Sequence, residues 1–181
     1  MRGDARDRKV VEAPPGYAPE IGRWLWALED GRQLTKKALA GLDPRVVDWV
    51  PPDDANSIGT LLYHLALIEA DWLSVEVLEQ EEYSAELATL LPDPDRDERG
   101  GLTRLRGVSL DAHLGRLDAI RARVLAAFRG MSLEEFCRTR HLPDYDVTPE
   151  WVVHHLIQHE AEHRGEIGLL RELAGRSAGQ P

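Results

Sequence analysis

The chain lacks the features that mark secreted, membrane-spanning or nucleic-acid-binding proteins. Its 181 residues include one cysteine, Cys137, which has no partner for an internal disulfide and is typical of a reducing compartment. No apolar run approaches the roughly 18 residues that a transmembrane helix needs, and the N-terminus lacks the apolar segment of a signal peptide. A formal net charge of −10 disfavours nucleic acid or an anionic membrane as a partner. We therefore expect a soluble cytoplasmic protein.

Alternating strand patterns of useful length are also missing, whereas four segments carry apolar residues at helical spacing. Each segment opens at a residue that caps helices or suits their first turn; these residues are Pro19, Asn56 or Ser57, Ser109, and Thr148 followed by Pro149. The fourth helix is expected to end near Gly175. The pattern predicts an all-α bundle of four main helices.

The connections between these helices differ in length. Residues 80–108 contain prolines, paired glycines and mixed charge, which predicts a long crossover between the second and third helices rather than a tight hairpin. Ser132-Leu-Glu-Glu135 is a capping box and predicts a short extra turn. Residues 138–148 are expected to be irregular or weakly extended. We predict one domain over residues 19–175, with tails at 1–18 and 176–181.

One stretch of the fourth helix, HLIQHEAEHRGEI from His155 to Ile167, holds three histidines four residues apart. His159 and His163 fall in the same helical stripe as the aliphatic residues, so they are predicted to face the interior. Two imidazoles four apart on a helix can reach one ion at the usual Zn–N distance of about 2.0–2.1 Å. The alternative is that both form hydrogen bonds as ordinary core residues, since buried polar groups need partners.

A third ligand would come from elsewhere in the chain. His64 lies mid-helix at the edge of an apolar stripe and could point inward at a similar depth, whereas His113 is a weaker candidate and His141 is expected to be exposed. His155 lies one turn before His159 but is rotated about 40° around the helix from it, and His154 points further away. We expect these last two to flank the site.

The letters HEAEH, from His159 to His163, also match the H-E-x-x-H pattern of zinc proteases. The extended form of that pattern fails, because Glu166 stands where its glycine should be and Leu169 where its last histidine should be. No strand pattern is present to bind an extended peptide. The protease interpretation is therefore disfavoured.

Two regions together carry a family resemblance. The first, Leu28–Leu73, combines a leucine-rich helix, the turn Trp-Val-Pro-Pro, an Asn-Ser-Ile helix start and a mid-helix histidine. The second, Thr148–Ile167, contains H-x-x-x-H-R-G. In this combination the chain resembles, over roughly residues 20–175, the DinB/YfiT-like superfamily of four-helix-bundle metalloproteins. One departure is Glu162, where relatives often have a second histidine.

The resemblance implies that His64, His159 and His163 bind one divalent metal ion in a central cavity, with Zn or Ni first and Fe, Co or Mn as alternatives. It also implies an unusual helix order and a homodimer. Three neutral histidines leave the ion its full charge and an open position, which is typical of a catalytic site. Asp71, His155 and Glu160 are expected near the ligands, where Asp71 and Glu160 could accept imidazole N–H groups.

Characterised relatives transfer small thiols such as bacillithiol or mycothiol, so the resemblance implies a metal-dependent thiol S-transferase or a related detoxifying enzyme. Its partners would be a small-molecule thiol and an electrophile. A hydrolase that uses metal-bound hydroxide and a non-catalytic metal- or ligand-binding stress protein are the two alternatives. The sequence does not single out a general acid or base.

Overall fold

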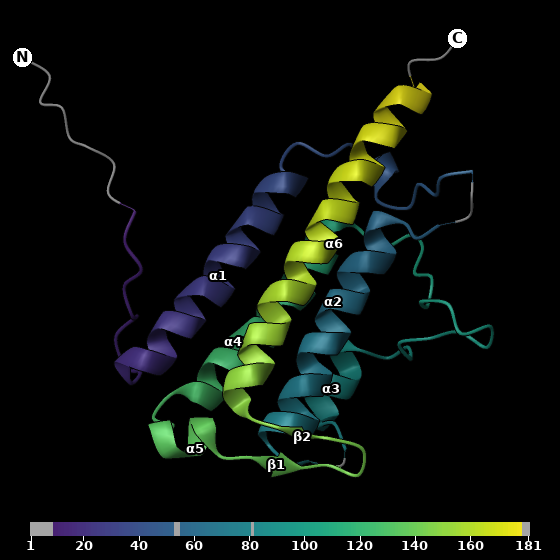
Figure 1. Ribbon diagram of the computed structural model, residues 1–181. Coiled ribbons are helices and arrows are strands. Elements are labelled where there is room, and N and C mark those ends of the chain that lie inside the picture. Colours follow the sequence, from purple (N-terminus) through teal and green to yellow (C-terminus); the bar gives the residue numbers. More distant parts are fainter. Residues whose placement is uncertain (1–8, 53–54, 81, 179–181) are drawn as a thin grey trace, which may run out of the picture.

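Four long helices make up most of the computed structural model, which describes residues 9–52, 55–80 and 82–178 (Figure 1). These main helices are α1 (Pro19–Leu39), α2 (Ile58–Trp72), α4 (Leu110–Phe128) and α6 (Pro149–Ala178). The shorter helices are η1 (Pro44–Val46), α3 (Ala85–Leu90), α5 (Leu133–Cys137) and the π-helical turn η2 (Leu73–Val77). The predicted all-α bundle of four main helices is confirmed.

The helices begin where the sequence places their caps. The side chains of Ser57, Ser109 and Ser132 accept hydrogen bonds from backbone N–H groups in the first turns of α2, α4 and α5. Pro19 and Pro149 open α1 and α6, where a missing N–H costs nothing. At the other end, α6 continues through Gly175 to Ala178, three residues beyond its expected end.

The expected tails are only partly within the described residues, since 1–8 and 179–181 lie outside them. Within the N-terminal segment, the Tyr17 hydroxyl donates to the carbonyl oxygen of Leu125 at 3.1 Å, so this end of the segment contacts α4. None of the helices in the described part of the chain has the length and apolar character needed to cross a membrane.

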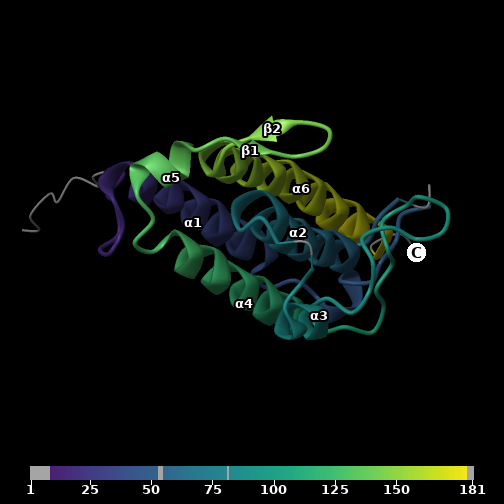
Figure 2. The same cartoon turned by 90° about the horizontal axis from the view of Figure 1, so that it is seen from below.

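Contacts between the helices show their directions. Trp24 near the start of α1 donates to Glu150 at the start of α6, and Arg171 near the end of α6 donates to the Ala38 carbonyl, so α1 and α6 run parallel. Helices α2 and α4 also run parallel, and α2 is antiparallel to α6 (Figures 1 and 2). Two consecutive parallel helices require a long return connection, which is the predicted crossover.

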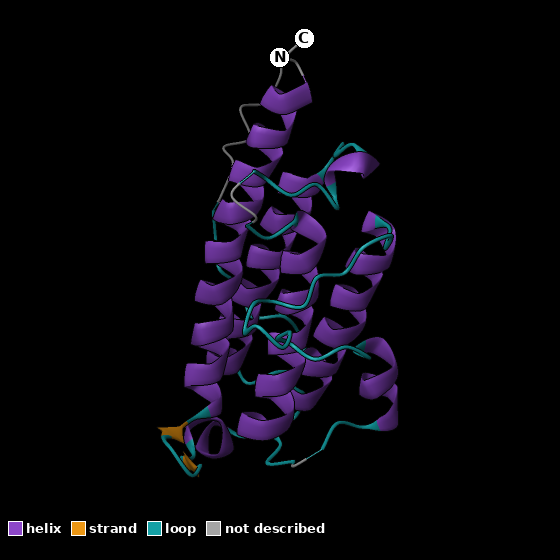
Figure 3. Ribbon diagram, turned by 90° about the vertical axis from the view of Figure 1, so that its right-hand side faces the viewer, coloured by secondary structure: helices purple, strands orange, loops and turns teal. Residues whose placement is uncertain are grey.

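The crossover runs along the outside of the bundle and contains α3, which the sequence pattern did not predict (Figure 3). The segment expected to be weakly extended forms a small antiparallel hairpin of β1 (Arg140–His141) and β2 (Asp146–Val147). This hairpin lies at the end of the bundle where α2 ends and α6 begins (Figure 1).

Each main helix contributes one charged residue to the centre of the bundle, and together they form a closed ion-pair ring. Arg32 of α1 donates to Glu160 of α6 at 2.8 Å and to Glu69 of α2 at 2.6 Å. Arg121 of α4 donates to Glu69 at 2.5 Å and to Glu160 at 3.1 Å. All four residues are buried. Two apolar clusters lie on either side of the ring, toward opposite ends of the bundle.

Candidate metal centre

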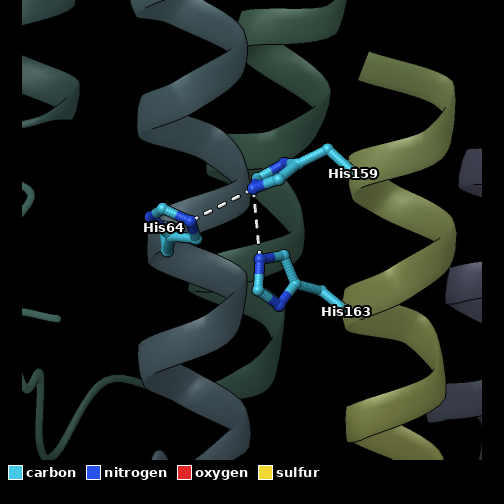
Figure 4. Close-up of side chains that lie close together, drawn as sticks. All are labelled: His64, His159 and His163. Atoms are coloured by element: carbon cyan, nitrogen blue, oxygen red, sulfur yellow. Dashed lines mark hydrogen bonds between the residues drawn. The ribbon is translucent and has the colours of Figure 1, made fainter. Parts of the chain in front are cut away.

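The structure brings His64, His159 and His163 together between α2 and α6 (Figure 4). The Nε2 atom of His159 lies 3.1 Å from Nε2 of His64 and 3.1 Å from Nε2 of His163. The three ligand atoms all lie within 4.8 Å of one another. Because α2 and α6 are antiparallel neighbours, the middle of α2 faces the two histidines that share one face of α6.

These separations suit a single ion. At a Zn–N distance of about 2.0–2.1 Å, two nitrogens of a tetrahedral site lie about 3.3 Å apart. The two contacts that His159 makes are therefore close to the ligand spacing of such a site. The cluster is a candidate site for one divalent ion.

Carboxylates hold two of the rings with their Nε2 atoms toward the cluster. Nδ1 of His64 lies 2.6 Å from Oδ1 of Asp95, and Nδ1 of His163 lies 3.3 Å from Oε2 of Glu166. An ionised carboxylate can only accept a hydrogen bond, so both Nδ1 atoms carry the hydrogen and both Nε2 atoms present a lone pair. The single Nε2–H of a neutral His159 can donate to only one of these two lone pairs. A bound cation would instead accept a lone pair from each of the three Nε2 atoms.

Burial also favours the neutral imidazoles that bind metals. It lowers the pKa of His159 to about 3, with smaller contributions from His163, His64 and His155. Burial likewise lowers the pKa of His64 below its usual value, although Asp95 opposes this shift. The His163 side chain is 14% exposed, so the site is reachable from solvent. The residues present thus fit a divalent ion with an open coordination position.

Asp95 is the functional residue that the sequence did not reveal. It lies in the crossover, 31 residues after His64, in a segment where acidic residues are common. Its contact with His64 depends on how the crossover folds back along α2. No local spacing rule connects a loop carboxylate to a histidine at that separation, so the sequence carries no signal for it.

Of the three residues expected near the ligands, Glu160 and Asp71 make contacts elsewhere, and His155 flanks the cluster as expected. Glu160 accepts from Arg32 and Arg121 in the ion-pair ring, since it projects about 100° around the helix from His159. Asp71 accepts from the Tyr83 hydroxyl at 3.1 Å. His155 stacks on Trp151, with ring centroids 5.2 Å apart, and lies next to the histidine cluster rather than in it.

The remaining histidines lie outside the cluster. His141 is exposed, as expected, and pairs with Asp146. His154 packs edge-on against Trp24. His113 is buried in the first turn of α4, where its Nε2 atom has no hydrogen-bond partner among the described residues. The third nitrogen of the cluster comes from His64 and not from His113.

Replacing Asp95 with asparagine should weaken metal binding by about 10–100-fold, because the carboxylate orients His64 and raises its basicity. Titration of the metal-free protein with Zn²⁺ against a competing chelator would measure the change. Asp93→Asn is the matched control, since Asp93 uses its backbone, through Tyr63, to hold the same loop. Equal affinities for Asp95→Asn and wild type would contradict a supporting role for Asp95.

His113 should make the protein sensitive to mild acid. Burial and then Arg116 lower its pKa to about 4, from 6.5 in the unfolded chain. Below pH 6.5 the unfolded state therefore binds a proton that the folded state does not, and the free energy of unfolding falls as the pH falls. His113 should account for about 2 kcal/mol of that loss between pH 7 and pH 5.

Urea unfolding of wild type and His113→Gln at both pH values would isolate this contribution. The variant should lose less stability than wild type between pH 7 and pH 5, because glutamine does not titrate. Equal losses in the two proteins would show that His113 is protonated to the same extent folded and unfolded.

Comparison with known proteins agrees with this architecture. A family model of the DinB superfamily matches residues 27–167, which include all three clustered histidines. The chain belongs to the DinB superfamily. Four main helices packed together are the arrangement expected for this DinB protein.

One solved structure similar to this DinB protein is described as a conserved protein of a locus from Enterococcus faecalis. It is 16% identical in sequence, with a TM-score of 0.65, and the match covers 83% of this chain and 94% of the other. At that identity the likeness concerns the fold alone. A search of curated proteins gives no significant match.

Proposed function

We propose that this DinB protein is a metal-dependent transferase that joins a low-molecular-weight thiol to an electrophile. The observation that carries the proposal is the convergence of three Nε2 atoms on one point. Neutral nitrogen ligands leave the charge of a divalent ion uncompensated and leave room for an exogenous ligand. A structural site would more commonly use four protein ligands, often including thiolates.

A bound divalent ion in this site would supply Lewis acidity and so favour the ionised form of a thiol at neutral pH. In the overall reaction the sulfur forms a bond to the electrophilic atom, the leaving group departs with its bonding electrons, and the thiol proton passes to solvent. Thiol transfer is also the activity that the resemblance of the sequence implies. This reaction would make use of both the positive charge of a bound ion and the partial exposure of the site.

The protein's own residues would orient the site and admit the reactants. Asp95 fixes His64, and Glu166 lies against His163. A cavity of about 570 Å³ borders the Asp95 side of the cluster, between α2 and the crossover. Leu67, Ile68 and Leu91 provide apolar surface in this cavity. The cavity reaches Asp95, which contacts His64, and we take it as the proposed approach for small reactants.

The test is thiol consumption with monobromobimane or 1-chloro-2,4-dinitrobenzene as the electrophile. Protein loaded with Zn²⁺ or Ni²⁺ should accelerate conjugation of one bacterial thiol, and metal-free protein should not. Wild-type-like rates in a His159→Ala/His163→Ala variant would assign the activity to another site. If metal-loaded protein accelerates no thiol, the transferase proposal fails. Hydrolysis of ester substrates would then test the alternative function, that of a metal-dependent hydrolase.

A further inference from the structure

A second cavity lies near the metal centre, at the end of the bundle that carries the β-hairpin. Its volume is about 420 Å³, and its lining combines the end of α2, the hairpin and the first turn of α6. The lining residues are Trp72, Tyr145, Asp146, Val147 and Trp151. A cavity of this size falls within the range of small-molecule sites.

Aromatic rings dominate this cavity and remain open to solvent. Trp72 lies 5.3 Å from Trp151 and 6.3 Å from Tyr145, measured between ring centroids. Trp151 is 47% exposed and Tyr145 is 45% exposed. Large aromatic side chains that line a cavity and stay exposed are typical of a binding surface, because they offer a wide apolar contact at low entropic cost.

A row of ring contacts connects this cavity to the histidine cluster. His155 lies 4.4 Å from Trp72 and 5.8 Å from His159, again between ring centroids. One imidazole therefore separates the cavity lining from a residue of the histidine cluster. Trp151 and His159 are eight residues apart on α6, which corresponds to about 12 Å along the helix. A molecule seated on the two tryptophans could extend along α6 toward the cluster.

The charges around the cavity are acidic. Asp146 lines it, and no lysine or arginine is among the described residues that do. The Tyr145 hydroxyl donates to Glu76 at 2.6 Å, and the second oxygen of this buried carboxyl has no hydrogen-bond partner among the described residues. Burial and the neighbouring Glu76 carboxyl raise the pKa of Tyr145 to about 12, so the phenol is neutral at neutral pH, and burial also raises the pKa of Glu76 above its usual value. Because Asp146 is acidic and no lysine or arginine is among the described lining residues, the cavity disfavours an anionic ligand.

We propose that this cavity binds the electrophilic substrate of the neighbouring metal site, and that the substrate carries a planar aromatic group that is neutral or positively charged. Indole and phenol faces attract both flat apolar rings and cations, and the acidic surroundings repel anions. The proposal rests on the proposed function for the identity of the reaction, but the binding itself can be measured without any thiol.

Isothermal titration of zinc-loaded protein with three naphthalene compounds tests the proposal. The compounds are 2-naphthylmethylammonium, 2-naphthylmethanol and 2-naphthalenesulfonate, which share a ring system and differ in charge. The ammonium compound should bind at least as tightly as the alcohol, and the sulfonate at least tenfold more weakly than either. Equal or tighter binding of the sulfonate, or no binding of the ammonium compound, would overturn the proposal.

Substitutions of the lining residues would test whether the naphthalene compounds bind in this cavity. Trp151→Ala and Tyr145→Ala should each weaken binding of the ammonium compound at least fivefold, since each removes an exposed ring that lines the cavity. Leu169→Ala is the matched control, because Leu169 is an exposed apolar residue of α6, 57% exposed, that lies beyond the histidine cluster. An affinity within twofold of wild type in both aromatic variants would show that the compound binds elsewhere.

Two other outcomes separate this inference from the proposed function. If thiol transfer is absent but the naphthyl compounds bind as expected, the cavity stands as an aromatic binding site and only the reaction is wrong. If thiol transfer occurs but no naphthyl compound binds, only the cavity proposal fails. Light scattering on Trp151→Ala would show whether this face instead joins two copies of the chain; loss of a dimer without ligand binding would overturn the proposal.

Discussion

Replacement of both His159 and His163 with alanine should abolish binding of a divalent ion. The two side chains supply two of the three nitrogens that converge in the cluster, and a single remaining histidine binds such ions weakly. Elemental analysis after metal loading and dialysis should give about one ion per chain for wild type and close to none for the variant. Removal of His64 should have a similar effect, because it supplies the only nitrogen of the cluster that comes from α2.

His155→Ala provides the control for this prediction. His155 belongs to the same helix and the same run of histidines, and it stacks on Trp151 rather than joining the cluster. Its removal should leave the metal content unchanged. Equal metal content in wild type and in the His159→Ala/His163→Ala variant would remove the basis for a metal centre and for the function proposed from it.

Breaking the ion-pair ring at the bundle centre should cost the most stability. Glu69 accepts from Arg32 and Arg121, and both guanidinium groups are buried. Burial opposes ionisation of Glu69, but Arg121 and Arg32 outweigh it and hold the pKa of Glu69 below its usual value. Glu69→Gln would leave two buried cations sharing one remaining carboxylate within the ring. The free energy of unfolding should fall by about 3–5 kcal/mol.

Urea unfolding at neutral pH, followed by circular dichroism, measures this loss. Lys36→Ala is the matched control, since it breaks a partly exposed ion pair with Asp118 on the same bundle and should cost about 1 kcal/mol or less. Similar losses in Glu69→Gln and Lys36→Ala would mean that the ring contributes no more than a surface pair. A fully unfolded Glu69→Gln variant would agree with the prediction, because total stabilities are themselves about 5–15 kcal/mol.

Much of the fold follows from local rules that the sequence displays directly. Ser57, Ser109 and Ser132 cap helices because their side chains accept hydrogen bonds from the N–H groups three residues on. The crossover is also readable, since prolines and paired glycines exclude regular structure over a stretch too long for a hairpin. Helix α3 was not predicted because its six residues are too few to show a helical period within that stretch.

Some features of the candidate site also follow from local sequence, and others depend on contacts between distant residues. Helical spacing alone places His159 and His163 on one face of a helix, because a spacing of four is close to one helical turn. His64 is one of several candidate third ligands from its position on an apolar stripe, and the family resemblance selects it. The contact of Asp95 with His64, and those of Glu160 with Arg32 and Arg121, arise from the tertiary structure. Those contacts join residues 31 or more positions apart, so they depend on helix packing and on the path of the crossover, which no local spacing encodes.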